Sequence, residues 1–269
     1  MTNTINKPQP KPVVLCFSGH DPSGGAGIQA DIEAISAQGC HAATVITALT
    51  CQDTRHVQSF KPVDANKLKK QADMLLKDMP ISAIKIGMTA DVEVVIAIHT
   101  ILTTHKEIPV ILDPVLASGA GSSLSSSELV KAINTYLLPH CQLITPNIPE
   151  AFTLSNSSDN TEAAADILLE MGAEHVLITG THAKSTLVEH YLYHANKPQQ
   201  QFQNTRLAHE YHGSGCTLAS SIAAFIAKGL STSQAVKNGL DYSYQTLQHA
   251  HAPGHGQWLP DRLYKLNND

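Results

Sequence analysis

The chain contains 269 residues and lacks the marks of secreted, membrane-spanning and zinc-stabilised proteins. Its five cysteines are scattered without a Cys-x-x-Cys pair, which indicates free thiols and a reducing, cytoplasmic compartment. No apolar run approaches the roughly 18 to 20 residues that a helix needs to cross a bilayer. Fifteen histidines occur, but neither His-Glu-x-x-His nor a His/Cys cluster at zinc spacing is present, so we expect no structural metal site.

Basic residues are also few, with 18 Lys and Arg against 23 Asp and Glu and a formal net charge of −5. This balance gives no electrostatic reason to expect binding to nucleic acid or to an anionic membrane. Residues 1–12 are polar, contain three prolines and lack the apolar stretch of a signal peptide. We therefore predict a short flexible tail at 1–12, followed by one domain at 13–269.

Short β-branched runs alternate with segments of helical spacing along the chain. The predicted strands are residues 13–18, 43–49, 83–86, 110–112, 143–144 and 176–179. Helical patterns occupy residues 28–35, 68–79, 125–139, 164–171, 215–228 and 232–249. This alternation predicts an α/β fold in which helices cover a mostly parallel sheet. Two further runs, 185–194 and 200–206, predict a small antiparallel hairpin at the sheet edge.

The first candidate site follows the first strand, because ligands of open α/β sheets bind beyond the carboxyl ends of strands. Residues 18–27 carry three glycines in four positions and lead into a helix, so a ligand can approach the backbone there. Residues 25–30 also match the dinucleotide pattern Gly-x-Gly-x-x-Ala. However, residues 19–23 intervene after the strand and no acid closes the next strand, which weakens that interpretation. A purely structural glycine-rich turn is the alternative.

Two further candidate sites are acidic and also follow strands. Asp113 comes directly after the strand at 110–112, where it can hold Mg²⁺ through water or can simply initiate a turn. Asn147 and Glu150 lie three residues apart in a proline-rich stretch, and their oxygens suit a hard cation such as Mg²⁺. The alternative for Glu150 is support of the first turn of the following helix.

The fourth candidate is the helix start at residues 212–217. Gly213 and Gly215 precede an apolar helix whose first N–H groups can surround an anion, although no Walker sequence is present. Cys216 lies in the first helical turn, where we expect the helix field to lower the pKa of its thiol. The alternative for Cys216 is a buried small hydrophobic residue.

These four segments, in this order, resemble the ribokinase-like superfamily and, within it, the hydroxymethylpyrimidine/phosphomethylpyrimidine kinases of thiamine biosynthesis. The resemblance is carried by residues 19–31, 45–49 with Gln52, 85–88, 113–115, 145–150 and 213–217. It implies a three-layer sandwich that binds ATP, Mg²⁺ and an aminopyrimidine, and it implies a homodimer. The expected dimer could use the hairpin at 185–206.

The resemblance also implies a role for each matching position. Gln52 and the backbone at Ala26 and Gly27 would bind the aminopyrimidine. The wall of its pocket would include Asp31, Met88 and Val115. The nucleotide and its Mg²⁺ would be held by Asp113, Asn147 and Glu150, with Thr179 contacting the nucleotide. An anion hole would form from Gly213, Ser214, Gly215 and Cys216, and Cys216 stands where most relatives carry an aspartate base.

The chain departs from the family at two places. Many relatives carry a lysine a few residues after the acid of the Asp-Pro-Val segment, where this chain reads 116–122 without one, and many have Lys-Gly-Gly-His where this chain has 179–182. The loss of two cations leaves open how a bound monophosphate is held. We expect the Gly- and Ser-rich segment 118–127 to form a mobile lid. Alternatives to this kinase are a pyridoxal kinase, a nicotinamide-dependent oxidoreductase and a non-catalytic pyrimidine-binding protein.

Overall fold

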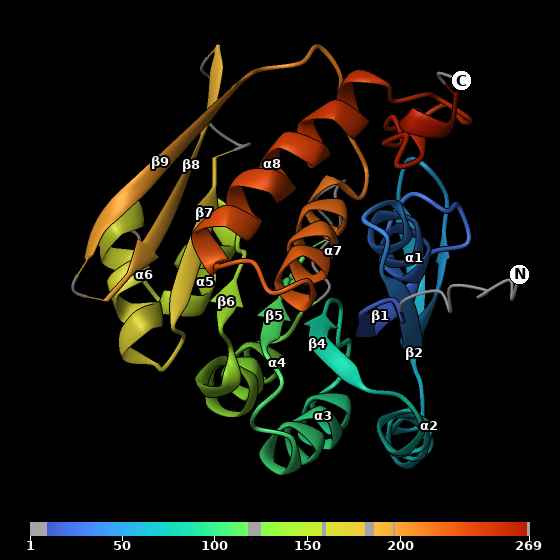
Figure 1. The fold of residues 1–269 in the computed structure, drawn as a ribbon, viewed down its shortest axis with the longest axis vertical. Coiled ribbons are helices and arrows are strands. Elements are labelled where there is room, and N and C mark those ends of the chain that lie inside the picture. Colours follow the sequence, from blue (N-terminus) through green and yellow to red (C-terminus); the bar gives the residue numbers. More distant parts are fainter. Residues whose placement is uncertain (1–9, 118–124, 158–159, 181–185, 196, 268–269) are drawn as a thin grey trace, which may run out of the picture.

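The computed structural model describes residues 10–117, 125–157, 160–180, 186–195 and 197–267. Within these ranges the strands form a nine-stranded sheet in the order β3-β2-β1-β4-β5-β6-β7-β8-β9 (Figure 1). Its parallel part comprises β1 (Val13–His20), β2 (His41–Gln52), β4 (Ile81–Ile86), β5 (Val110–Leu112), β6 (Leu143–Ile144) and β7 (His175–Thr179). The predicted α/β fold with a mostly parallel sheet is therefore confirmed.

Antiparallel strands lie at both edges of the sheet. The hairpin β8 (Leu187–His194) and β9 (Lys197–Thr205) continues from β7 and confirms the predicted hairpin at 185–206. At the other edge, β3 (Val57–Pro62) pairs antiparallel with β2 and was not predicted. Its sequence is half polar because much of the strand is exposed, so it lacks a continuous apolar run. Pairing with β3 also carries β2 three residues past its predicted end at 49.

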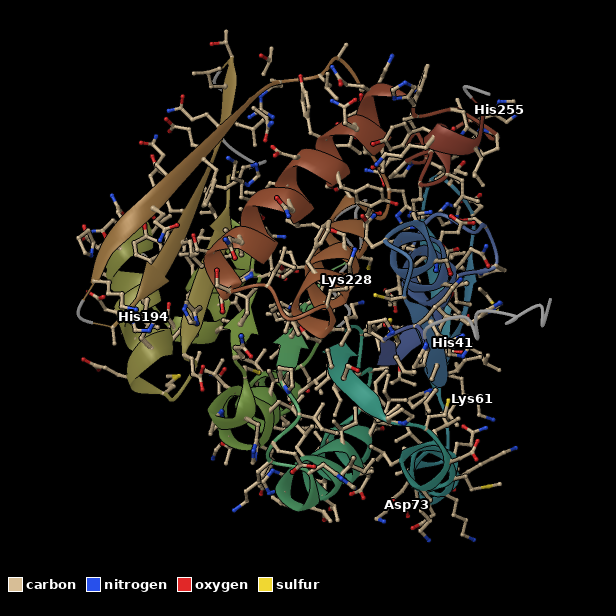
Figure 2. All side chains as sticks on the ribbon, in the orientation of Figure 1. His41, Lys61, Asp73, His194, Lys228 and His255 are labelled. Atoms are coloured by element: carbon tan, nitrogen blue, oxygen red, sulfur yellow. The ribbon has the colours of Figure 1, made fainter. Side chains whose placement is uncertain are left out.

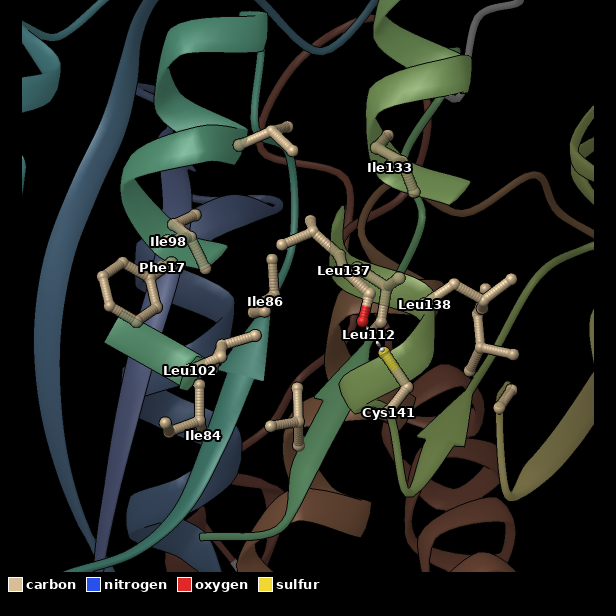
Figure 3. Close-up of a cluster of buried hydrophobic side chains, with 14 of the residues drawn as sticks. Phe17, Ile84, Ile86, Ile98, Leu102, Leu112, Ile133, Leu137, Leu138 and Cys141 are labelled. Atoms are coloured by element: carbon tan, nitrogen blue, oxygen red, sulfur yellow. Dashed lines mark hydrogen bonds between the residues drawn. The ribbon is translucent and has the colours of Figure 1, made fainter. Parts of the chain in front are cut away.

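Helices cover both faces of the sheet (Figure 1). One face packs against α1 (Gly27–Ala37), α7 (Ser214–Ala227) and α8 (Thr232–Gln248). The other packs against α2 (Ala65–Asp78), α3 (Val92–Thr104), α4 (Ser127–Ala132), α5 (Ile148–Ser155) and α6 (Thr161–Glu170). Successive residues of β1 supply the two cores alternately: Phe17 packs with Ile98 and Leu102 of α3 (Figure 3), whereas Cys16 belongs to the α7 side. The three-layer arrangement is as predicted.

Helix ends follow local sequence signals, with one correction. Ser231 and Gln234 form the capping box that opens α8, and Gly172 adopts a φ of +113° after α6. The helix predicted from residue 125 starts later, because Ser126 caps α4 by accepting a hydrogen bond from the N–H of Leu129. The α3 helix escaped prediction because its apolar residues are not confined to one stripe.

The charged side chains of Lys61 and Lys228, labelled in Figure 2, are exposed. Among the described residues, none of the helices combines the length and the apolar character that a membrane crossing requires. The cysteines at 16, 40, 51, 141 and 216 carry free thiols. Most of the predicted flexible tail (1–9 of 1–12) and of the predicted lid (118–124 of 118–127) lies outside the described residues.

Candidate active site

A cleft of about 600 Å³ opens at the carboxyl ends of the parallel strands, between the sheet and the starts of α1 and α7. Its lining contains the following residues that the sequence singled out: Ala26, Gly27, Gln52, Met88, Asp113, Val115, Asn147, Glu150, Thr179, Gly213, Ser214, Gly215 and Cys216. Segments up to 190 positions apart in the chain therefore meet in one cavity, as expected for loops that follow neighbouring parallel strands.

The wall formed by residues 26–27 depends on glycine. Gly27 has a φ of +57°, and a Cβ at this position would collide with the carbonyl oxygen of Gly19. Beside this wall, the Nε2 of Gln52 donates a hydrogen bond of 2.8 Å to the Oγ1 of Thr50. This contact orients the Gln52 amide at the cleft surface, where its carbonyl oxygen can accept a hydrogen bond from a ligand.

The glycine-rich loop is fixed by Asp21, a contact that sequence reasoning missed. The carboxylate accepts hydrogen bonds from the N–H of Ser23, the hydroxyl of Ser23, the N–H of Ala26 and the Nε2 of His212, at 2.7 to 2.8 Å. Although burial raises the pKa of Asp21, the hydrogen bonds from His212 and Ser23 outweigh it and lower the pKa to about 2. The 21–27 loop and the segment before α7 are therefore tied together directly.

Asp31 does not line the cleft, so the expectation that it forms part of the pocket wall is not met. Its side chain is fully buried between α1 and the sheet, where its Oδ1 accepts hydrogen bonds from Lys85 Nζ (2.9 Å) and Ser220 Oγ (2.6 Å). The reason is geometric: Asp31 lies one turn inside α1, on the face that packs against the sheet and α7. Sequence reasoning missed a role for Lys85, although a lysine flanked by Ile84 and Ile86 in a buried strand is an unusual signal.

Lys85 places a positive charge beneath the cleft floor. Its Nζ lies 2.9 Å from Asp31, 3.1 Å from the Oγ of Ser18 and 3.8 Å from the Oδ2 of Asp113. Burial lowers the pKa of Lys85, but nearby carboxylates, chiefly that of Asp31 and also that of Asp113, outweigh burial and raise it, so the ammonium persists. Conversely, burial raises the pKa of Asp113, while Lys85 and a hydrogen bond from the Cys216 thiol oppose that rise.

Cys216 behaves differently from the expectation for a helix start. Burial and the charge of Asp113 raise the pKa of its thiol to about 12, and Lys85 compensates only in part. The predicted lowering by the helix field is thus reversed. The group at this position is a thiol, not a thiolate, near neutral pH.

Asn147 and Glu150 serve two purposes at once. They form the capping box of α5: Asn147 Oδ1 accepts from the Glu150 N–H, and Glu150 Oε2 accepts from the Asn147 N–H, both at 2.9 Å. The alternative interpretation of Glu150 as support for the helix start is therefore correct, yet both residues also face the cleft. Burial, and to a smaller degree the charge of Asp113, raise the pKa of Glu150 to about 8.

The donors at this end of the cleft fit a hard cation. Asp113 Oδ2 is buried without a hydrogen-bond partner, so it has lone pairs to offer to a ligand in the cleft. The carboxylate of Glu150 lines the same cavity, and the set contains oxygen atoms alone. No group of three or more His, Cys, Asp or Glu side chains that could hold a metal occurs in the described ranges. A cation here would thus need phosphate or water oxygens as further ligands, which is common for Mg²⁺.

The far lobe of the cleft was not foreseen from the sequence. It is lined by residues of β8 and α8 and of the 204–211 segment, among them Val188, His190, Arg206, Leu240, Ser243 and Tyr244. His190 pairs with Thr179 across the β7–β8 ladder, and Thr179 forms a bridge with Asn147. These contacts place the β8 side of the cavity next to the predicted nucleotide residues. The β8 strand carried a hairpin signal only, so nothing in its sequence indicated a site.

Comparison with known proteins identifies the family. The model of the phosphomethylpyrimidine kinase family matches residues 21–261. The chain belongs to this family. It is 37% identical over 216 residues to the hydroxymethylpyrimidine/phosphomethylpyrimidine kinase of Salmonella typhimurium, covering 78% of this chain and 81% of that protein. The family predicted from the sequence is therefore confirmed.

Further comparisons concern the length of the relatives and the fold of solved structures. It is 33% identical over 253 residues to a bifunctional thiamine biosynthesis protein of Geobacter sulfurreducens, covering 93% of this chain and 52% of that protein, and so spans about half its length. A phosphomethylpyrimidine kinase structure from Clostridium difficile superposes with a TM-score of 0.77 at 32% identity, covering 88% of this chain and all of that one. The pyridoxal kinase of Staphylococcus aureus in complex with ADP gives a TM-score of 0.85 at 26% identity, covering 94% and 93% of the two chains.

Proposed function

We propose that the protein is an ATP-dependent kinase that phosphorylates hydroxymethylpyrimidine and its monophosphate, yielding the diphosphate used in thiamine biosynthesis. One observation carries the proposal. The Gln52 amide and the 26–27 wall face the N-terminal turn of α7 across one cleft, which also contains Asn147 and Glu150. Acceptor-binding groups, an anion-binding helix start and oxygen donors for a cation are thus within one cavity.

In this proposal the chain acts chiefly by positioning and by electrostatic stabilisation. Gln52 and the backbone at Ala26 and Gly27 orient the aminopyrimidine, while the N–H groups of Ser214 to Cys216 face the phosphoryl group during transfer. Mg²⁺, held by Glu150 and Asp113, would neutralise phosphate charge. Because the transition state of phosphoryl transfer is loose, a strong base matters less than this charge stabilisation, and Cys216 contributes chiefly through its backbone N–H group at the start of α7.

The proposal includes the finer expectations from the sequence: Mg²⁺ as cofactor, a homodimer, a catalytic domain at 13–269 and a cytoplasmic location. The free thiols at all five cysteines support a reducing compartment. The orphaned Asp113 Oδ2 supports the cation. Thr179 is proposed as a nucleotide contact because it lies beside Asn147 in the cleft.

A second candidate is pyridoxal phosphorylation. It is favoured by the close superposition on the Staphylococcus aureus pyridoxal kinase, a fold likeness that extends over almost the whole chain. The two candidates share the donor half of the cleft and differ at the acceptor wall, where Gln52 offers an amide suited to an aminopyrimidine.

A steady-state comparison of kcat/KM on hydroxymethylpyrimidine, its monophosphate and pyridoxal, with ATP and Mg²⁺, tests the proposal. We expect both pyrimidines to exceed pyridoxal. Gln52→Leu, which removes the amide at similar size, should lower kcat/KM for hydroxymethylpyrimidine by about 5- to 100-fold and affect pyridoxal less. Pyridoxal as the preferred acceptor would establish the second candidate, and turnover of neither would reject both.

A further inference from the structure

The C-terminal segment 254–262 touches three parts of the cleft that are far apart in sequence. The backbone of Trp258 pairs with the stretch before α7, accepting from His212 N and donating to Glu210 O, both at 2.9 Å. Gln257 N donates to the carbonyl of Thr54 at 2.9 Å, two residues beyond Gln52. The segment therefore joins the acceptor side and the α7 side of the cleft, and Gln257 itself lines the cavity.

At the end of this segment the guanidinium of Arg262 is almost completely buried, with 1% of its side chain exposed. Its NH1 donates to the Gly24 carbonyl at 3.4 Å, and its NH2 donates to the Gly25 carbonyl. Its Nε donates to Thr217 Oγ1 at 2.8 Å, and NH1 also pairs with Glu33 Oε2 at 3.0 Å. Three of these four hydrogen bonds therefore go to the glycine-rich loop or to the first turn of α7, and one goes to a carboxylate.

Thr217 passes the contact on to the anion-binding helix start. Its hydroxyl accepts from Arg262 and donates to the Gly213 carbonyl at 2.8 Å. Gly213, with a φ of +78°, packs so closely on the loop that a Cβ there would collide with the Gly25 carbonyl. Arg262 thus holds both sides of a backbone-to-backbone contact between the acceptor loop (residues 21–27) and the α7 start (residues 213–217).

We propose that Arg262 is a positioning residue, which fixes the acceptor loop and the α7 start at the separation across which the phosphoryl group is transferred. The inference rests on the proposed function. Its physical basis is the planar fork of arginine, which reaches carbonyl, hydroxyl and carboxylate acceptors at once; a lysine ammonium at the same place cannot span them. Misplacement of reacting groups by about 1 Å can cost roughly 100-fold in rate, so small shifts at this contact matter.

The test compares Arg262→Lys with Glu33→Gln, a matched control that removes the charge of the ion-pair partner and leaves the fork on Gly24, Gly25 and Thr217. We expect Arg262→Lys to lower kcat about tenfold or more and to raise the KM for hydroxymethylpyrimidine, with the KM for ATP changed less than about twofold. For Glu33→Gln, we expect kcat, the KM for hydroxymethylpyrimidine and the KM for ATP to stay within about twofold of the wild-type values. Amide hydrogen exchange without substrate should accelerate at residues 23–27 and 213–217 in Arg262→Lys alone.

An Arg262→Lys enzyme with wild-type kcat and exchange, or an equal loss in Glu33→Gln, would overturn the proposal. Equal effects on both KM values would indicate a merely structural role and would also overturn it. Should Arg262→Lys fail to fold, Thr217→Val removes the acceptor of the Arg262 Nε together with the hydrogen bond to the Gly213 carbonyl. This variant must then show the same loss of kcat with a nearly unchanged KM for ATP. A wild-type protein that phosphorylates none of the substrates would reject the proposed function. The hydrogen-exchange comparison needs no substrate, so it would still test whether Arg262 holds the two segments together.

Discussion

The protonation state of Cys216 gives a sharp test of the cleft electrostatics. A free thiol at a helix start would have a lowered pKa. Here burial and Asp113 raise the pKa to about 12 from an ordinary value of 9.0. At pH 7.5 a thiol of pKa 12 is ionised to roughly 3 × 10⁻⁵, against about 3% at pKa 9, a difference of about 10³-fold. Since the thiolate is the reactive species, this difference is directly measurable.

The assay is alkylation by iodoacetamide across pH 7 to 10.5, with the Cys216 peptide quantified by mass spectrometry and exposed Cys51 as an internal reference. Below pH 10.5 we expect the Cys216 rate to increase about tenfold per pH unit without a plateau, because ionisation stays far from complete. Restricted access slows alkylation at every pH and leaves this slope unchanged, so the slope separates the two effects. A plateau below about pH 9 would refute the reasoning and would show that Cys216 can act as a thiolate base.

Two further predictions concern the glycine-rich loop. In steady-state assays, Gly27→Ala should raise the KM for the pyrimidine about tenfold or more, because its Cβ would collide with the Gly19 carbonyl. Gly39→Ala is the control for backbone strain, since Gly39 has a similar φ of +79° but no atom within 4 Å of the added Cβ. This variant should leave the KM for the pyrimidine unchanged. The folded-state pKa of Asp21 is about 2, below its ordinary value of 3.8, so its contribution to stability is present above pH 3.8 and lost as the pH falls through 2. That contribution is about 2 kcal/mol, of which about 1 kcal/mol disappears between pH 5 and pH 3. Urea unfolding at both pH values should show this loss in wild type and not in Asp21→Asn; equal pH dependence in the two proteins would contradict the assigned pKa.

The position of the cleft could be predicted from the sequence because it depends on local signals. A strand that ends in Asp113, or a glycine-rich turn before a helix, can be recognised within ten residues, and parallel topology brings such turns to one edge. Asp31 was misplaced because its motif gives its neighbours in sequence and not the direction of its side chain in α1. Arg262 had no signal at all, since its four partners lie more than 40 residues away and are mostly backbone or hydroxyl oxygens. Long-range polar contacts of this kind have no periodicity to detect.

The charge of the cleft lining matters because this chain has no lysine at 116–122 and none at 179–182, two segments where a cation was expected from the family resemblance. Among its described lining residues Arg206 is the one Lys or Arg side chain, and Lys85 lies behind the wall, paired with Asp31. The described lining also contains the acidic side chains of Asp21, Asp113, Glu150 and Glu210, and burial raises the pKa of Glu150 to about 8. Apart from Arg206, the fixed positive field among the described lining residues comes from the N–H groups at the start of α7. Precise placement of that helix start therefore has to supply what cationic side chains supply in other relatives, which is why its contact with Arg262 carries functional weight.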